Sequence, residues 1–244
     1  MTINIGICGA NGKMGKLIFA HSSNLKDIDN IYLYSRNIEG SNLADLCARS
    51  DVVIDFSSDL CLANLLSEAA RHKTKFVIGT TGISDDTYRK IKELSETRAV
   101  LYSANMSFGV NLLQRVLSQF SKTLLAENFD AEILELHHKD KIDIPSGTAL
   151  MLGRSIADAC ELDFKKVVAI NRMGKREQGS IGISSIRAGS IIGEHQVIFA
   201  NCEEEITISH KALSRDIFAK SAIKAALKIA DKPAGFYDAS ILFE

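Results

Sequence analysis

The chain has 244 residues, of which 46% are hydrophobic, and its formal net charge is -1. This length and composition predict a folded chain with a sizeable core, built as one large domain or two modest ones, and argue against disorder. The near-zero charge and the lack of a basic stripe argue against a nucleic-acid partner. No apolar run approaches the roughly 18 residues of a membrane span, and no charged segment precedes an apolar one at the N-terminus. We therefore expect a cytoplasmic protein without a membrane partner.

Cysteine usage points the same way. The five cysteines are odd in number, widely spaced and free of any C-x-x-C pattern: Cys8, Cys47, Cys61, Cys160 and Cys202. Such spacing indicates neither a disulfide framework nor a zinc site. We expect buried free thiols and no metal.

The first hundred residues alternate short apolar runs with amphipathic stretches. Strands are predicted at 3–8, 31–34, 52–56, 75–79 and 99–105, and helices at 13–23, 60–71 and 84–96. Near-continuous apolar strands that alternate with helices are typical of a parallel, doubly wound sheet with helices on both faces. The fold predicted for this part is an α/β, Rossmann-like domain.

The regular alternation of strands and helices ends at about Phe108, where a long amphipathic helix is predicted to begin. Further on, strands are predicted at 130–138, 180–187, 195–201 and 204–212, with a helix at 146–159 and a last one at 215–230. This pattern favours a second, α+β domain with a mixed or antiparallel sheet. We predict that residues 1–107 and 216–244 form the first domain and residues 108–215 the second.

A glycine-rich turn, "GICGANGKMG", follows the first predicted strand and opens the first helix. Its glycines are Gly6, Gly9, Gly12 and Gly15. Such a turn lets backbone amides approach a pyrophosphate at a helix N-terminus, although a turn without a ligand also fits the motif alone. Three later strand ends favour a ligand, because Ser35 and Arg36, "GTTG" at 79–82 and "SANMS" at 103–107 all follow strands of the same sheet.

The end of the second strand also predicts which dinucleotide binds. An acid there usually holds the ribose hydroxyls of NAD, but this chain has Ser35 and Arg36, which suit a 2'-phosphate. NADPH is therefore the preferred cofactor, with NADH as the second. The alternative is that Arg36 is a solvated surface residue.

The stretch "ELHHKDKIDIPSGTA", residues 135–149, places two histidines, two lysines and a small-residue turn together. It resembles the E-x-H-H-x-x-K-x-D-x-P-S-G-T-A signature of the dihydrodipicolinate reductase family. The segments "GANGKMG", "FVIGTTG", "SANMSFGVN", "RAGSIIGEH" and "SHKALSR" follow in the family's order, so the resemblance covers nearly the whole chain.

The resemblance implies an NAD(P)H-dependent reductase of lysine and diaminopimelate biosynthesis. Such an enzyme reduces 4-hydroxy-tetrahydrodipicolinate, via dihydrodipicolinate, to tetrahydrodipicolinate by passing hydride to a small cyclic dicarboxylate. It also implies an N-terminal dinucleotide-binding domain, and a C-terminal domain that binds the substrate and assembles a homotetramer.

Residue by residue, the resemblance assigns catalysis to His137 and Lys141. The substrate would contact His138 and the turn formed by Ser146, Gly147 and Thr148. The residues similar to cofactor-binding positions are Gly9, Ala10, Asn11, Gly12, Lys13, Met14, Arg36, Gly79, Thr80, Thr81, Ser103, Ala104, Asn105 and Met106.

The chemistry justifies the same residue types independently. Hydride addition to a conjugated imine leaves negative charge that must be protonated, which a histidine or lysine within hydrogen-bond reach can do. A turn before a helix offers amides and the positive end of the helix dipole to a carboxylate. In the alternative interpretation, the histidine pair is satisfied locally and Ser146 and Thr148 are ordinary helix caps. His195 and His210 are expected to be structural, and Asp143 to position its neighbours.

Two other functions remain open at this stage. A semialdehyde dehydrogenase on a similar two-domain plan would need a cysteine nucleophile at a helix start, and we predict none there. A dinucleotide-binding regulator would have lost its chemistry, against which the presence of both His137 and Lys141 argues.

Overall fold

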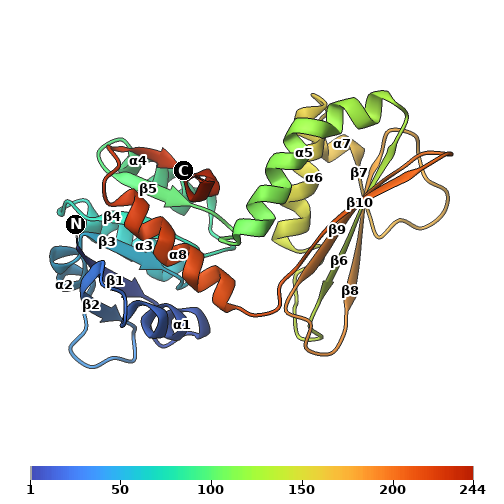
Figure 1. The fold of residues 1–244 in the computed structure, drawn as a ribbon. Coiled ribbons are helices and arrows are strands. Elements are labelled where there is room, and N and C mark those ends of the chain that lie inside the picture. The colour runs from blue at the N-terminus through green and yellow to red at the C-terminus, as the bar shows by residue number, and fades with distance from the viewer. Residues whose placement is uncertain (1, 244) are drawn as a thin grey trace. The chain divides into compact units, whose positions relative to one another are not determined.

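The computed structural model describes residues 2–243, which fold into two compact units. The first unit combines Met1–Phe108 with Arg215–Glu244, and the second is Gly109–Ser214. Figure 1 shows the chain entering the second unit at helix α5 (Phe108–Ala126) and returning to the first before helix α8 (Asp216–Ile229).

The first unit is built on a six-stranded parallel sheet in the order β11-β5-β4-β3-β1-β2. Its strands are β1 (Ile3–Cys8), β2 (Ile28–Tyr34), β3 (Val52–Asp55), β4 (Lys75–Ile78), β5 (Ala99–Tyr102) and β11 (Gly235–Tyr237). The predicted Rossmann-like sheet is thus confirmed. Sequence patterning missed only β11, a strand of three residues.

Helices cover both faces of this sheet, because successive strand side chains point to opposite sides. Ile5 and Ile54 share a core with α1 (Lys13–Ser22) and α8, whereas Val53 faces the other core. That second core is formed with α2 (Leu43–Arg49), α3 (Asp59–Ala69) and α4 (Asp85–Ser95), and a short 3-10 helix, η1 (Ala239–Phe243), follows β11. Helix α2 was not predicted from the sequence.

The strand order reverses direction at β1, which lies between β2 and β3. In open α/β sheets, ligands bind at such a switch point, outside the carboxyl ends of the strands. The glycine-rich turn after β1 and the polar residues that follow β2 lie at this edge of the sheet.

The second unit contains a five-stranded mixed sheet in the order β10-β9-β6-β8-β7. Its elements are β6 (Asp130–His137), α6 (Gly147–Ala159), α7 (Phe164–Val167), β7 (Val168–Ile170), β8 (Ile181–Arg187), β9 (Glu194–Ala200) and β10 (Glu205–Lys211). Strand β6 runs antiparallel to β9 and parallel to β8. The prediction of a mixed sheet is confirmed.

The central strand β6 carries the core of this unit toward a polar end. Every second side chain of the strand points inward and is buried: first Ala131 and Ile133, then Glu135 and His137. Helices α5 and α6 cover that face and lie on one side of the strands in Figure 1. An acid and a histidine therefore continue a hydrophobic stripe, which requires partners for both.

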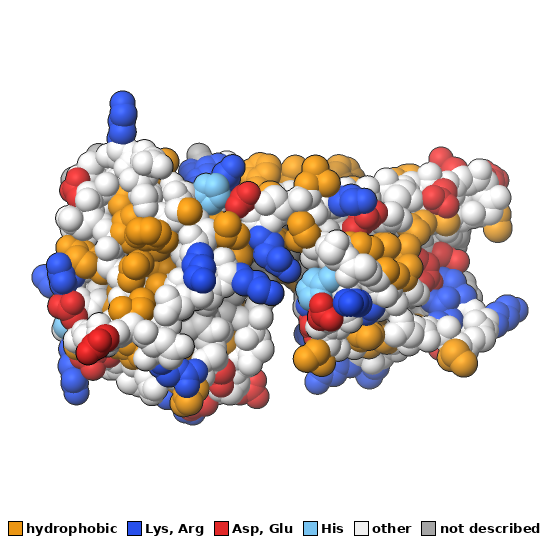
Figure 2. All heavy atoms as spheres, turned by 90° about the horizontal axis from the view of Figure 1, so that it is seen from below, with side chains coloured by type: hydrophobic (Ala, Val, Ile, Leu, Met, Phe, Trp, Pro, Cys, Tyr) orange, Lys and Arg blue, Asp and Glu red, His pale blue; other side chains and the backbone are white. Residues whose placement is uncertain are grey.

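Charged side chains are mixed over the surface. Figure 2 shows lysine and arginine interspersed with acidic and hydrophobic side chains on the face in view. Helix α5, the longest described, is amphipathic, with Leu113 and Leu117 buried and Leu112 and Phe120 exposed. Within residues 2–243, no helix combines the length and hydropathy of a membrane span.

Candidate active site

Glu135 is the centre of a buried network in the second unit. Its side chain is fully buried, and Arg187 on β8 binds it with two parallel hydrogen bonds, Nη1 to Oε2 at 3.0 Å and Nη2 to Oε1 at 2.7 Å. The backbone amide of Ser146 donates to Oε1 at 3.1 Å, and Nδ1 of His137 bonds to Oε2. A paired arginine–carboxylate contact of this kind fixes both orientation and distance.

This network keeps Glu135 ionised. Burial raises the pKa of its carboxyl, but hydrogen bonds from His137 and Arg187 outweigh burial and lower the pKa to about 2. Since an ionised carboxylate can only accept, Nδ1 of His137 carries the proton that it donates. The other ring nitrogen, Nε2, points toward Gly193, where a Cβ atom would lie only 3.1 Å away. Glycine at that position therefore leaves space beside Nε2.

Arg187 also fixes the loop that carries Lys141. Its Nε donates to the carbonyl of Lys141 at 3.3 Å and its Nη2 to the carbonyl of Asp143 at 2.6 Å. Within the loop, Nζ of Lys141 donates to both carboxylate oxygens of Asp143, at 2.7 and 2.9 Å. Burial opposes ionisation of Asp143, but the bond from Lys141 prevails and lowers its pKa. The contact agrees with a positioning role for Asp143.

The small-residue turn opens helix α6. Ser146 is its N-cap and accepts a hydrogen bond from the amide of Ala149 at 3.2 Å. Ser146 is therefore a helix cap, as the alternative interpretation of this turn predicts. The first residue, Gly147, is exposed, and a side chain added there would meet no described atom within 4 Å. Open space at the N-terminus of a helix suits a carboxylate, because the helix dipole favours an anion there.

His195 joins the site from β9. Its Nε2 lies 3.1 Å from Oγ of Ser146, and its ring packs edge-on against His137 with centroids 5.2 Å apart. Burial, and then the nearby His137, lower its pKa to about 3, so His195 is neutral near pH 7. Its other nitrogen, Nδ1, is buried and has no hydrogen-bond partner among residues 2–243. We had expected a structural histidine, but the structure places it against the predicted substrate turn.

Glu135, His137 and His195 also offer three ligand atoms within 4.8 Å of one another. Both oxygens of Glu135, however, are already bound by the guanidinium of Arg187. A divalent cation would have to displace that buried positive charge. The donor set therefore fits an ion-pair network better than a metal centre.

In the first unit, the glycine-rich turn is tightly packed. Gly9 has a φ of +83°, and a Cβ there would lie 2.3 Å from the carbonyl oxygen of Phe56. The amides of Gly9 and Ala10 both donate to the carbonyl of Tyr34 at 3.0 Å, and the amide of Gly12 donates to the carbonyl of Gly9 at 3.0 Å. The amides of Asn11, Lys13 and Met14 are therefore the candidate anion donors of the turn. Helix α1 begins after Gly12 without a side-chain cap, an arrangement found where helices bind phosphate.

A pocket of about 330 Å³ lies beside this turn. It is lined by Gly9, Tyr34, Ser35, Arg36, Asn37 and Cys61. The structure thus brings Arg36 and the glycine-rich turn to one cavity. Arg36 lies where a group attached to an adenosine ribose would reach it if a dinucleotide follows the edge of the sheet.

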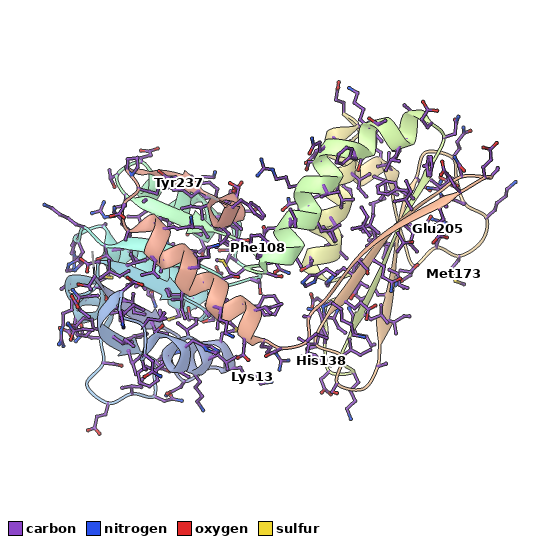
Figure 3. The ribbon with its side chains drawn as sticks, viewed as in Figure 1. Lys13, Phe108, His138, Met173, Glu205 and Tyr237 are labelled. Carbon is purple, nitrogen blue, oxygen red and sulfur yellow. The ribbon has the colours of Figure 1, made fainter. Side chains whose placement is uncertain are left out.

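The other predicted cofactor residues differ in accessibility. Those whose side chains or backbone are exposed are Asn11, Gly12, Lys13, Thr81 and Ala104, and Figure 3 labels Lys13 at the start of α1. Thr80 is buried and bonds to Asp55, while Ser103 bonds to Asn105. Met106 is 2% exposed and belongs to the core.

The predicted catalytic residue His137 and the predicted substrate residue Ser146 share the Glu135 network. His138, labelled in Figure 3, follows the end of β6 and is half-buried. Three members of the network had no role in our sequence prediction: Glu135, Arg187 and His195. The signal for Glu135 was present, since an acid that continues the apolar face of a strand needs a buried partner.

Two expectations about cysteines were wrong. Cys61 is the third residue of α3, so a cysteine does lie at a helix start. The cysteines are also not uniformly buried, because Cys61 and Cys160 are half-buried and Cys202 is exposed. The predicted helix begins one residue later than α3, at Leu60.

Comparison with known proteins decides the family. Residues 3–106 match the family model described as dihydrodipicolinate reductase, N-terminus, and residues 109–242 match the model for its C-terminus. The chain belongs to the dihydrodipicolinate reductase family. Curated relatives include the 4-hydroxy-tetrahydrodipicolinate reductase of Rickettsia bellii, 42% identical over 97% of this chain and 93% of the relative. That of Clostridium novyi is 41% identical over 95% of this chain and 94% of the relative.

Solved structures agree on the fold. A dipicolinate-bound dihydrodipicolinate reductase from Paenisporosarcina sp. TG-14 has a TM-score of 0.78 and 22% identity, with 99% of each chain covered. The diaminopimelate dehydrogenase of C. glutamicum is more distant, with a TM-score of 0.54 and 15% identity over 99% of this chain and 96% of that one.

Membership in the dihydrodipicolinate reductase family makes this chain an oxidoreductase. It performs the reduction step of lysine and diaminopimelate biosynthesis on a small-molecule substrate, with a nicotinamide cofactor. The semialdehyde dehydrogenase and the regulator are thereby set aside, the first despite the helix-start position of Cys61.

Proposed function

We propose that this reductase converts 4-hydroxy-tetrahydrodipicolinate, via dihydrodipicolinate, to tetrahydrodipicolinate with His137 and Lys141 as its proton-donating cluster. The observation that carries the proposal is the buried Glu135 network, which holds His137 and the Lys141 loop through the same two side chains, Glu135 and Arg187. A network of this kind orients groups that must meet a substrate, and a merely structural histidine would not require it.

His137 and Lys141 have different tasks in this proposal. When bound, a nicotinamide cofactor supplies the hydride. Glu135 accepts a hydrogen bond from the protonated Nδ1 of His137 and so fixes the ring. Nε2, beside Gly193, is then the atom that exchanges a proton with the substrate. Lys141 brings a positive charge that stabilises the charge developing on the reduced ring.

The substrate's carboxylate is proposed to bind at the N-terminus of α6. Gly147 leaves open space there, between Ser146 and Thr148 in the chain. His138 completes the substrate contacts. The helix dipole favours an anion at this end by about 0.3–1 kcal/mol in an exposed position.

NADPH is proposed as the preferred cofactor and NADH as the weaker one. The residues proposed to hold the dinucleotide are the turn Gly9–Met14, Arg36, Gly79 to Thr81 and Ser103 to Met106. Support comes from the pocket that Arg36 shares with Gly9, and from the absence of an acid among its described lining residues.

Arg36→Ala should separate the two cofactors. A charge-assisted contact with the 2'-phosphate is worth about 1.5–3 kcal/mol, so we expect NADPH to bind roughly 10- to 100-fold more weakly. NADH lacks that phosphate and should change by about twofold or less. Titration of both cofactors against wild type, Arg36→Ala and the exposed control Arg71→Ala measures this. Equal losses for NADH and NADPH would mean that Arg36 supports the loop and does not contact the phosphate.

The two units are proposed to divide the work. Residues 1–107 and 216–244 would bind the dinucleotide, and residues 108–215 would bind the substrate and assemble a homotetramer. The sheet face opposite α5 and α6 supports the assembly role, because Leu134, Leu136, Ile186 and Ile198 lie on it and none is fully buried.

The activity itself has a direct test. Purified protein, mixed with pyruvate, aspartate semialdehyde and the preceding synthase, should oxidise NADPH, and more slowly NADH. The loss of nicotinamide absorbance should require the synthase, which makes its omission the control. If neither cofactor is consumed in a synthase-dependent way, the proposed reaction is wrong.

A further inference from the structure

Cys8 and Cys61 form a thiol pair at the proposed cofactor pocket. Their sulfur atoms are 3.6 Å apart, although the residues are 53 positions apart in sequence. Cys8 ends β1, immediately before the glycine-rich turn, and is fully buried. Cys61 is half-buried and lines the pocket together with Gly9 and Arg36. One sulfur is therefore accessible from the pocket and the other only through the first.

We propose that Cys8 and Cys61 are a modification site for a peroxide-class oxidant, and that their disulfide weakens binding of the nicotinamide cofactor. The oxidation depends only on the two thiols, whereas its effect on binding rests on the proposed cofactor site.

The surroundings give the two sulfurs different roles. The hydrogen bond between the two sulfurs lowers the pKa of Cys61 despite its burial, and Arg36 adds to this effect. Cys61 also lies in the first turn of α3, where the helix N-terminus favours a thiolate. The bond to Cys61, burial and the nearby Asp55 raise the pKa of Cys8. Cys61 is thus the nucleophile, and Cys8 is the protonated partner that resolves it.

The reaction balances with hydrogen peroxide as the only oxidant. The Cys61 thiolate attacks one peroxide oxygen, the O–O bond breaks, and the second oxygen leaves as hydroxide, which is protonated to water. The sulfur of Cys8 then attacks the resulting sulfenic acid, the S–S bond forms, and the S–O oxygen leaves as water with the proton of Cys8. In total, two thiols lose two electrons and peroxide becomes two waters.

Closure has a structural cost at the pocket. A disulfide is about 2.05 Å long, so the two sulfurs must approach by roughly 1.5 Å from their 3.6 Å separation. The turn beside Cys8 is closely packed, because even a Cβ atom added at Gly9 would lie 2.3 Å from the carbonyl oxygen of Phe56. Formation of the disulfide must therefore displace either the glycine-rich turn or the pocket residues near Arg36. A bound cofactor would cover Cys61 and slow its oxidation.

The test is to treat cofactor-free enzyme with hydrogen peroxide and map its disulfides by mass spectrometry under non-reducing conditions. We expect a Cys8–Cys61 link that dithiothreitol reverses, and that NADPH, added first, delays. The dissociation constant for NADPH, measured by its fluorescence, should rise by about tenfold or more, since ångström-scale displacements in binding sites are costly. Cys61→Ser should lose the link and the sensitivity, whereas Cys202→Ser, at the exposed cysteine, should keep both.

Two outcomes would overturn the inference. If peroxide oxidises Cys202 or over-oxidises Cys61 without a Cys8–Cys61 link, the pair is not a disulfide site. If the link forms and NADPH affinity is unchanged, its effect on the cofactor is refuted. Neither result depends on turnover, so a failure of the proposed reaction, seen as an untreated enzyme that binds NADPH but reduces nothing, remains distinguishable.

Discussion

His137→Ala and Lys141→Ala are each expected to lower kcat by about 10²- to 10⁴-fold, the usual contribution of a positioned proton donor. His137 is held by Glu135 at one nitrogen only, and Lys141 sits in a loop whose carbonyls Arg187 binds. Neither side chain belongs to the hydrophobic core, so we expect the substitutions to lower the rate of the chemical step and not the stability of the fold. Steady-state kinetics in the synthase-coupled assay measure it.

Lys141→Ala should also raise KM, because a cation that faces a dianionic substrate contributes to binding as well as to the transition state. Cofactor affinity should hardly change in either variant. The matched control is Lys139→Ala, which removes the same charge from an exposed position two residues away. Near-normal turnover of the two test variants would show that the cluster is structural and that its assigned roles are wrong.

Most of the fold could be predicted from the sequence because its elements are long and periodic. The inner parallel strands of the first unit, β1, β3, β4 and β5, are buried on both faces and read as continuous apolar runs. Strand β6 is buried on one face and alternates. The misses were short elements, such as β7, β11 and the four-residue helix α7, whose few residues carry no detectable period. Their formation depends on neighbours distant in sequence, as β11 depends on β5.

The site was predictable only where its residues are contiguous. Residues 135–149 could be identified because they form one dense cluster of charges followed by a predicted helix N-terminus. The side chains that hold the cluster come from other strands, Arg187 from β8 and His195 from β9. Strand pairing brings them beside Glu135, and no local pattern in the sequence encodes which strands pair across a mixed sheet. The proximity of Cys8 to Cys61 was not predictable either, because it depends on how helix α3 packs against strand β1.

Arg187→Met is expected to destabilise the second unit by about 3–5 kcal/mol, because it leaves the fully buried carboxylate of Glu135 without its counter-charge. It also removes the bonds that tie the carbonyls of Lys141 and Asp143 to β8. Urea unfolding followed by circular dichroism measures the loss. Hydrogen exchange in peptides from β6 and β8 localises it to this sheet.

A second substitution separates the buried charge from its catalytic use. Glu135→Gln in the Arg187→Met background removes the unpaired charge, so the double variant should regain much of the lost stability. Turnover should remain low, because a neutral amide no longer holds Nδ1 of His137 as an ionised carboxylate does. The control Lys122→Met breaks the exposed pair with Glu161 and should leave stability almost unchanged, because solvent screens such a pair. If Arg187→Met costs no more than this control, the network does not stabilise the sheet. If the double variant recovers full turnover, the network does not position His137.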